Sequence, residues 1–244
     1  MKFPHRKRVN KVAINGLRKF SLIDYPGKVC CVVFLGGCNF RCPFCHNPVL
    51  VFDPESQGTL SGEDLRDFFS RRQGKLDAAV FSGGEPSLDP DLPQYIRLAK
   101  NAGFQVKLDT NGSFPEVIRS LYEDGLLDAL GIDYKAPAHQ YMRICGNPDP
   151  QIPAKVRESI AFAVKNGIEL DVRTTVHRAL LCEADLRNMY DELSSLGVQQ
   201  WTLQQFHHAE LIDETLNDTS TWEDAELKKL AASLGPMTRV RGTL

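Results

Sequence analysis

Short apolar runs alternate with longer amphipathic stretches along most of this chain, and this alternation constrains its fold more than any other feature. The apolar runs predict strands and the amphipathic stretches predict helices, because the two elements bury side chains with different periods. The expected strands are residues 29–35, 78–81, 105–109, 129–133, 170–176 and 200–206. The expected helices are residues 61–72, 91–102, 115–124, 153–166, 183–196 and 222–234.

Strands and helices in this order indicate βαβ units and therefore a parallel sheet. Six such units fall short of the eight in a full (β/α)8 barrel. A partial barrel and an open sheet both fit, and we expect an α/β fold: a partial (β/α)6 TIM-like barrel with its active site at the C-terminal ends of the strands. No Pro-, Gly- or Ser-rich linker divides the chain, so we expect one domain over residues 1–244, with a core at about 15–207, a short basic N-terminal segment and a C-terminal helical extension.

Charge and hydropathy argue against two kinds of protein. The 29 Lys and Arg residues nearly balance the 31 Asp and Glu residues, which argues against a protein that works mainly by wrapping nucleic acid. The longest apolar run, residues 29–35, is far too short to span a membrane. The basic N-terminus lacks the apolar run of a secretory signal, so we expect a cytoplasmic protein. This N-terminus is either a phosphate- or partner-binding arm or a solvated or strand-pairing tail.

Three cysteines follow the first expected strand at a C-x3-C-x2-C spacing: Cys38, Cys42 and Cys45. The glycines and prolines around them suit a loop that wraps its thiolates around one centre. Unrelated buried cysteines, or zinc with His46 as fourth ligand, are alternatives, but adjacent Cys45 and His46 could hardly reach one metal together. Three thiolates favour a [4Fe–4S] cluster with one open iron, since such clusters ordinarily have four cysteine ligands. The remaining cysteines are expected to be structural: Cys30, Cys31, Cys145 and Cys182.

The cysteine spacing resembles that of the radical S-adenosylmethionine superfamily, and the resemblance extends beyond the motif. The stretch SLIDYPGK (residues 21–28), followed by VVFLGGCNFRCPFCHNP, is similar to activating proteins of anaerobic ribonucleoside-triphosphate reductase. These proteins belong to the glycyl-radical-enzyme activases, which include pyruvate formate-lyase activating enzyme. The similarity runs from about residue 15 to residue 207. It implies two cofactors, a [4Fe–4S] cluster and S-adenosylmethionine.

Polar residues and glycines lie at the C-terminal ends of the other expected strands. Taken singly, each has an ordinary explanation: a tight turn, a helix cap, a surface ion pair or a structural histidine. Their shared position is more informative, because barrels and open α/β sheets build active sites at that edge. The residues concerned are Gly83, Gly84, Glu85, Asp109, Thr110, Asp133, Lys135, Arg173 and His207.

The resemblance implies how some of these residues bind S-adenosylmethionine. Residues 83–85 would receive its amino group, since paired glycines expose backbone groups that a Cβ would keep from a ligand. Lys135 and His207 would approach its carboxylate and ribose. Phe44 would lie near the adenine, and Asn47 near the cofactor.

The resemblance also implies a possible ion site. Asp109, Thr110 and Asp133 match a monovalent-cation site of the pyruvate formate-lyase type. Arg173 is a further cofactor-binding candidate. No side chain beyond those that hold the cluster and the cofactor is expected to be catalytic.

The same resemblance implies the reaction and the partners. Reductive cleavage of S-adenosylmethionine at the cluster yields a 5′-deoxyadenosyl radical, which removes a hydrogen atom from one glycine of anaerobic ribonucleoside-triphosphate reductase. No cysteine lies between Cys45 and Gly83, so the chain lacks the two-cluster insertion of some activases, and a flavodoxin- or ferredoxin-type donor is expected to supply the electron. The alternatives are an activase of another glycyl-radical enzyme, of the pyruvate formate-lyase type, a radical S-adenosylmethionine enzyme acting on a small molecule, and, least favoured, a non-enzymatic zinc module.

Overall fold

Eight strands form one sheet in chain order within residues 13–242, the part of the chain that the computed structural model describes. They are β1 (Ile14–Ser21), β2 (Cys30–Leu35), β3 (Ala78–Gly83), β4 (Gln105–Thr110), β5 (Ala129–Asp133), β6 (Glu169–Val176), β7 (Trp201–Gln205) and β8 (Thr238–Arg241). β1 is antiparallel to β2, and each later strand is parallel to the one before it. The basic segment expected at the N-terminus lies outside the described residues.

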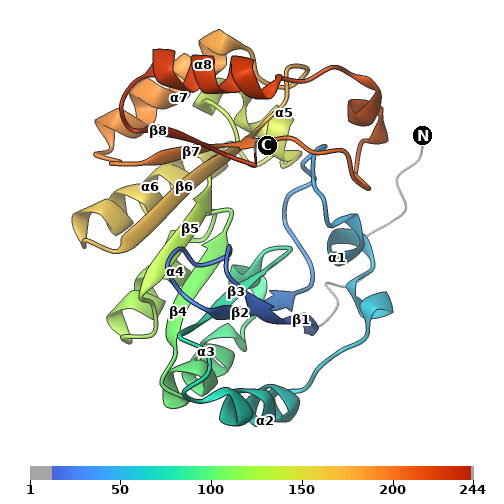
Figure 1. The fold of residues 1–244 in the computed structure, drawn as a ribbon, viewed down its shortest axis with the longest axis vertical. Helices are drawn as coiled ribbons and strands as arrows, with labels where there is room; N and C mark the ends of the chain where they lie inside the picture. Colours follow the sequence, from blue (N-terminus) through green and yellow to red (C-terminus); the bar gives the residue numbers. More distant parts are fainter. Residues whose placement is uncertain (1–12, 243–244) are drawn as a thin grey trace.

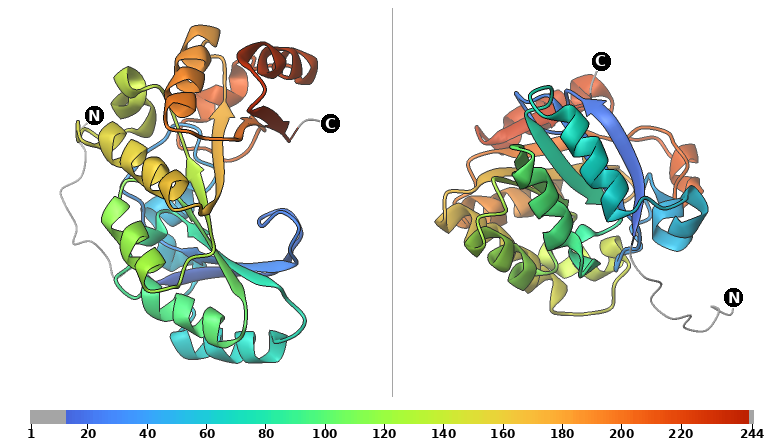
Figure 2. Two further views of the ribbon diagram at one scale, coloured as in Figure 1. Left: turned by 90° about the vertical axis from the view of Figure 1, so that its left-hand side faces the viewer. Right: turned by 90° about the horizontal axis from the view of Figure 1, so that it is seen from below.

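The longer helices follow one another around the convex side of this curved sheet, from α2 to α8 (Figure 1), and Figure 2 shows the same layer from two other sides. The helices are α1 (Pro48–Phe52), α2 (Gly62–Arg72), α3 (Leu92–Asn101), α4 (Pro115–Glu123), α5 (Tyr141–Cys145), α6 (Ile152–Lys165), α7 (Glu183–Ser195) and α8 (Asp224–Leu234). Short 3₁₀ helices occupy Pro54–Gln57, Pro86–Leu88, Ala138–Gln140 and Glu214–Asp218. All six expected strands and all six expected helices are present, which confirms the α/β partial barrel. None of the helices in the described residues is long and apolar enough to cross a membrane.

Two strands were not expected, and both lie at the edges of the sheet. β1 has the sequence INGLRKFS, in which the large apolar residues are three positions apart from one another rather than alternating with polar ones. Its pairing with β2 is interrupted by register shifts. β8 has four residues, and two of them are arginines. The C-terminal extension is therefore a helix followed by a strand rather than a helix alone. Edge strands are covered on fewer sides than central ones, so their apolar pattern is weaker.

Alternation along the strands sends neighbouring residues to opposite faces of the sheet. Cys31 packs in the large core under the helices, whereas Cys30 belongs to a small apolar cluster on the inner face. This confirms that the two cysteines are buried and divided between the faces. The inner face of β4 to β6 is charged instead, since Lys107 and Asp171 are buried there.

The SLIDYPGK stretch forms the turn between β1 and β2 and closes the N-terminal end of the barrel. The Tyr25 side chain is 1% exposed, and its hydroxyl donates to Glu169 Oε2 at 3.2 Å, at the start of β6. The carbonyl oxygen of Asp24 accepts a hydrogen bond from Lys107 Nζ at 2.8 Å. The opposite, C-terminal end of the barrel carries the cysteine loop.

Candidate active site

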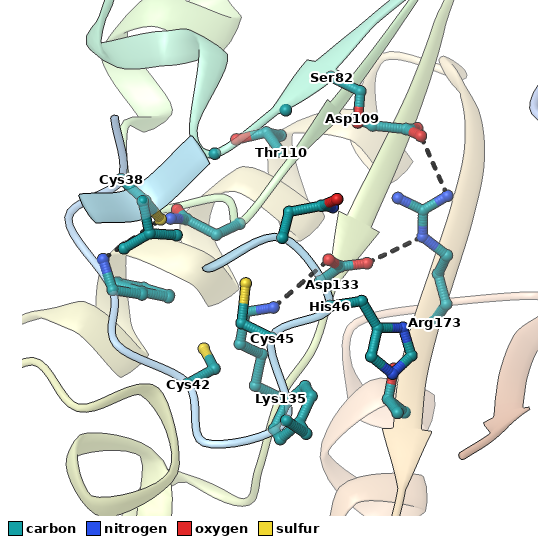
Figure 3. Close-up of a pocket in the computed structure, with 18 residues that line it drawn as sticks. Cys38, Cys42, Cys45, His46, Ser82, Asp109, Thr110, Asp133, Lys135 and Arg173 are labelled. Carbon is teal, nitrogen blue, oxygen red and sulfur yellow. Dashed lines mark hydrogen bonds and ion pairs between the residues drawn. The ribbon is translucent and has the colours of Figure 1, made fainter. Parts of the chain in front are cut away.

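One cavity of about 190 Å³ lies at the C-terminal ends of the strands (Figure 3). Twelve of the fourteen site residues expected from the sequence line it: Cys38, Cys42, Phe44, Cys45, Asn47, Gly83, Gly84, Asp109, Thr110, Asp133, Lys135 and Arg173. Glu85 and His207 do not. The cysteines lie on one side of the cavity and Asp109 and Arg173 on the other, with Lys135 next to Cys42 and Cys45, so the cavity can hold a sulfur-liganded group next to a polar molecule.

The cysteine loop follows β2 and is held by backbone contacts. Gly37 has a φ of +76° and donates its N–H to Leu50 O of α1 at 2.7 Å. The Arg41 N–H donates to Cys145 O at 2.7 Å, and its guanidinium donates to Cys38 O at the same distance. Because L-residues other than glycine rarely adopt a positive φ, Gly37 allows the chain to turn at the start of the loop.

A network of amide and hydroxyl groups fixes the same loop to the end of β4. Asn39 accepts from Asn111 Nδ2 at 2.8 Å and donates to Ser113 Oγ at 2.9 Å. Asn147 Nδ2 donates to the Asn39 carbonyl at 2.9 Å. The Cys-Asn-Phe sequence signals none of this, because the partners of Asn39 lie far away along the chain.

Burial controls the ionisation of the thiols. Burial raises the pKa of the Cys38 thiol to about 11, with the Glu85 carboxylate adding to the rise. Burial raises the pKa of Cys42 to about 12, while the Lys135 ammonium acts in the opposite direction. Metal binding requires thiolates, so these thiols must release their protons as a metal centre is incorporated. Among residues 13–242 no three His, Cys, Asp or Glu side chains converge closely enough to hold a single metal ion.

Gly83 and Gly84 lie against the backbone that leads into the cysteine loop. A Cβ on Gly84 would lie 2.0 Å from Gly37 O, and a Cβ on Gly83 would lie 2.2 Å from Leu35 O. The Glu85 N–H donates to Gly37 O at 2.8 Å. The two glycines therefore allow β3 to pack on the backbone that leads into the cysteine loop, and they also line the cavity. From the sequence, a tight turn and a contact with the ligand had both been open for them.

Glu85 lies behind the cavity wall and is fully buried. Its carboxylate accepts from the Thr110 hydroxyl at 2.7 Å, from the Asn111 N–H at 2.7 Å and from the Ser87 N–H at 3.0 Å. Burial raises the pKa of this carboxyl, and the three donors oppose the rise. Glu85 thus ties the end of β3 to the end of β4 instead of lining the cavity.

The charged side of the cavity is a chain of ion pairs (Figure 3). Lys135 Nζ lies 3.3 Å from Asp133 Oδ2, and Arg173 Nε lies 2.8 Å from Asp133 Oδ1. Burial opposes the ionisation of Asp133, but the two cations outweigh it and hold the pKa of this carboxyl well below its usual range. Lys135 Nζ also lies 5.6 Å from the centre of the Phe44 ring.

The chain of ion pairs continues into the barrel through residues that the sequence analysis did not single out. Lys107 Nζ lies 2.9 Å from Asp109 and 3.8 Å from Asp171. The signal was available, because Lys107 with Asp109, and Asp171 with Arg173, are charged pairs two residues apart on expected strands. Such pairs point to one face of a strand, and a charged pair in a central strand needs partners inside the protein.

His207 is exposed beyond the end of β7 and does not line the cavity. Its neighbour His46 does, and burial followed by the charge of His207 lowers the pKa of His46. His207 therefore stands at the rim of the site, and its role with the cofactor stays a prediction.

Comparison with known proteins agrees with this geometry. The family model of the radical SAM superfamily matches residues 32–193. A Methanocaldococcus jannaschii protein, to which the role of glycyl-radical enzyme activating enzyme is attributed, is 34% identical over 226 residues, 90% of each chain. The pyruvate formate-lyase-activating enzyme of Clostridium pasteurianum is 34% identical over 107 residues, which are 41% of this chain and 43% of that enzyme.

Solved structures show the same fold at low identity. Streptococcus suis SuiB bound to S-adenosylmethionine has a TM-score of 0.67 and 10% identity, over 84% of this chain and 48% of SuiB. TYW1 with a lysine-pyruvate adduct bound has a TM-score of 0.60 and 19% identity, over 84% of this chain and 72% of TYW1. The chain spans about half the length of SuiB. The radical SAM family implies an iron–sulfur cluster and S-adenosylmethionine as cofactors. The family match covers more than half of the chain and the archaeal relative nearly all of it, so this chain is an enzyme of the radical SAM superfamily, among the glycyl-radical enzyme activating enzymes.

Proposed function

We propose that this chain activates an anaerobic ribonucleoside-triphosphate reductase by generating a glycyl radical on it. One observation carries the proposal: three cysteines, the Gly83–Gly84 turn and a group of paired charges share one cavity, in a chain related over most of its length to an activating enzyme. The SLIDYPGK turn supports the reductase as the target, through the resemblance of its sequence.

The residues present suit both cofactors. Cys38, Cys42 and Cys45 would hold a [4Fe–4S] cluster, since they reach one cavity from one loop. When bound, the cluster and S-adenosylmethionine supply the 5′-deoxyadenosyl radical that takes a hydrogen atom from the glycine. Lys135 offers an ammonium group to the cofactor carboxylate, and Gly83 leaves backbone groups open to its amino group.

Asp133 and Arg173 hold these groups in place rather than meeting the cofactor themselves. Asp133 fixes Lys135, and Arg173 fixes Asp133, so the ammonium group is oriented before the cofactor binds. Phe44 and Asn47 both line the cavity, and the Phe44 ring would suit adenine. His207 at the rim would reach the ribose. The reaction needs no side chain as acid or base.

The proposal includes the surroundings in which the chain works. An electron donor of the flavodoxin or ferredoxin type would reduce the cluster, because no cysteine lies between Cys45 and Gly83, where some activases carry two further clusters. We place the protein in the cytoplasm, where the reductase and such donors would meet it.

A second target has its own support. Two pyruvate formate-lyase-activating enzymes, from Clostridium pasteurianum and Streptococcus mutans, are 34% and 36% identical to about 40% of this chain. The chain would then activate a glycyl-radical enzyme of the pyruvate formate-lyase type. The sequence of the cysteine loop does not distinguish between the two targets, so the experiment has to include both partner enzymes.

The experiment mixes the reconstituted protein anaerobically with S-adenosylmethionine, dithionite and either partner, each labelled with deuterium at glycine Cα. We expect a glycyl-radical signal by electron paramagnetic resonance on the reductase, narrowed to a single line because deuterium replaces the remaining Cα hydrogen, and deuterium in 5′-deoxyadenosine. The Cys42→Ala protein is the matched control and should give neither. A signal on the pyruvate formate-lyase alone would favour the second target. Unlabelled 5′-deoxyadenosine with no radical on either partner would indicate an enzyme that acts on a small molecule.

A further inference from the structure

The two carboxylates expected to hold a monovalent cation are already joined by an arginine. Arg173 Nε donates to Asp133 Oδ1 at 2.8 Å, and its Nη1 lies 3.2 Å from Asp109 Oδ2. The side chains of Arg173 and Asp109 are 13% and 9% exposed, so water screens this pair little. The planar guanidinium presents N–H groups in a fork, which lets one side chain bridge two carboxylates.

The third expected ligand of the ion, Thr110, is also engaged. Its hydroxyl donates to Glu85 Oε1 at 2.7 Å and accepts from the Gly112 N–H at 3.1 Å. The Thr110 oxygen is therefore committed to the Glu85 side of the wall. All three residues that the sequence assigned to an ion thus already have partners within the protein.

The charges around this point already balance. Three carboxylates, Asp109, Asp133 and Asp171, meet three buried cations, Lys107, Lys135 and Arg173. Each carboxylate has at least two cationic neighbours within 4.0 Å, and Arg241 approaches Asp171 from outside. A further monovalent cation would add an uncompensated charge beside the largely buried side chains of Asp109 and Arg173 or displace Arg173 from its partners, and both are unfavourable.

We propose that the Arg173 guanidinium takes the place of a monovalent cation between Asp109 and Asp133, so that this chain binds S-adenosylmethionine without K⁺ or Na⁺. Arg173 is then a positioning residue, because it acts on the cofactor through Asp133 and Lys135. The inference rests on the proposed function only in naming the cofactor. The built-in charge itself is a property of the metal-free chain.

The first test therefore needs no cofactor. Thermal unfolding of the metal-free protein is followed in choline chloride and in KCl at equal ionic strength. We expect the same Tm for the unaltered protein in both salts. Arg173→Gln should lower the Tm in choline chloride, and K⁺ should restore part of the loss, because Asp109 and Asp133 are left facing each other. Arg173→Lys keeps a charge but cannot bridge both carboxylates, so its Tm should respond less to K⁺. This variant replaces Arg173→Gln in the test if the Arg173→Gln protein does not fold.

The second test measures S-adenosylmethionine binding to the cluster-loaded protein by anaerobic calorimetry in the same salts. We expect the Kd of the unaltered protein to agree within about twofold between salts. The Arg173→Gln protein should bind about tenfold more weakly in choline chloride and regain affinity in KCl. Arg178→Gln is the matched control, since Arg178 is half-exposed and pairs with Glu226 away from the cavity.

The results separate this inference from the proposed function. A K⁺-dependent Tm or Kd of the unaltered protein would overturn the inference, and so would the absence of any K⁺ response in both Arg173 variants. Failure to bind S-adenosylmethionine in every salt, with the thermal results as expected, would count against the proposed function and leave standing the part of the inference that Arg173 takes the place of a cation between Asp109 and Asp133.

Discussion

The packing of Gly84 on the cysteine loop predicts that even one methyl group there disturbs the metal site. A Cβ at this position would lie 2.0 Å from Gly37 O, 2.7 Å from Gly37 C and 3.3 Å from Cys38 Cβ. Real Cβ atoms essentially never come closer than 3.0 Å to such a neighbour, so the chain at residue 37 must move by about 1 Å. Cys38 follows directly, and the Gly84→Ala change should displace this ligand.

The cost follows from the contacts. Overpacking against a neighbour that cannot rotate away costs about 1–3 kcal/mol. Separation of the two segments also weakens the hydrogen bond from the Glu85 N–H to Gly37 O, which contributes about 1 kcal/mol. The φ of Gly84 is not positive, so the backbone conformation adds no strain. We expect the free energy of unfolding to fall by about 2–4 kcal/mol.

The assay is urea unfolding of the metal-free Gly84→Ala protein by circular dichroism, followed by iron analysis after anaerobic reconstitution. With an m-value of about 3 kcal/mol/M, the midpoint should fall by about 1 M. The iron content should fall as well. Gly62→Ala is the matched control, because its new Cβ would find only Tyr95 Cε1, at 3.7 Å, and should leave both readouts unchanged. An unchanged midpoint with full iron loading of Gly84→Ala would refute the argument.

Three further predictions concern the ends of the barrel. Burial lowers the pKa of His177, whose Nδ1 accepts from the Ala179 N–H at 3.2 Å, so the free energy of unfolding should fall as the pH drops from the unfolded pKa of about 6.5 towards the folded pKa. In urea titrations, the His177→Gln protein should lose less stability between pH 7 and pH 5 than the unaltered protein, and an equal loss would contradict the assignment. Gly146→Ala should lower the free energy of unfolding in urea by about 2–4 kcal/mol and reduce iron loading, because its Cβ would lie 2.7 Å from Arg41 O at a φ of +62°. The control Gly125→Ala has a φ of +67° but open space around its Cβ, so it should lose only about 1–2 kcal/mol and keep its iron. Tyr25→Phe should lower the free energy of unfolding in urea by about 1 kcal/mol through the lost bond to Glu169. The Kd of S-adenosylmethionine should not change, because Lys107 keeps its bond to Asp24 O, and a weakened Kd would contradict this.

The central strands and helices could be predicted from the sequence because their buried residues form apolar runs or recur with a regular period. The strand expected at residues 129–133 shows an apolar run and the helix expected at residues 153–166 an apolar face, and the structure has them as Ala129–Asp133 and Ile152–Lys165. Edge elements could not be predicted in this way. The five-residue helix α5 and the strand β8 are too short to show a period, and their contacts come from distant parts of the chain.

The candidate site could be predicted as a set of positions but not as a set of contacts. The spacing of Cys38, Cys42 and Cys45 and the strand-end rule bring twelve expected residues to one cavity. The rule does not say which way a side chain turns, and Glu85 turns behind the wall to bind Thr110. The partners of Arg173 likewise depend on three strands meeting side by side, which only the folded sheet reveals.

The SLIDYPGK turn and the cavity lie at opposite ends of the barrel, and one buried side chain connects them. Lys107 Nζ donates to Asp24 O in the turn at 2.8 Å and lies 2.9 Å from Asp109, which in turn contacts Arg173. Lys107 is 2% exposed, so its ammonium group depends on these few partners for the interactions that water would otherwise supply. A shift of the turn would therefore change the position of the Lys107 charge and, through Asp109, that of the guanidinium. The motif that carries the resemblance to reductase activators is thus linked to the wall of the cavity through Lys107.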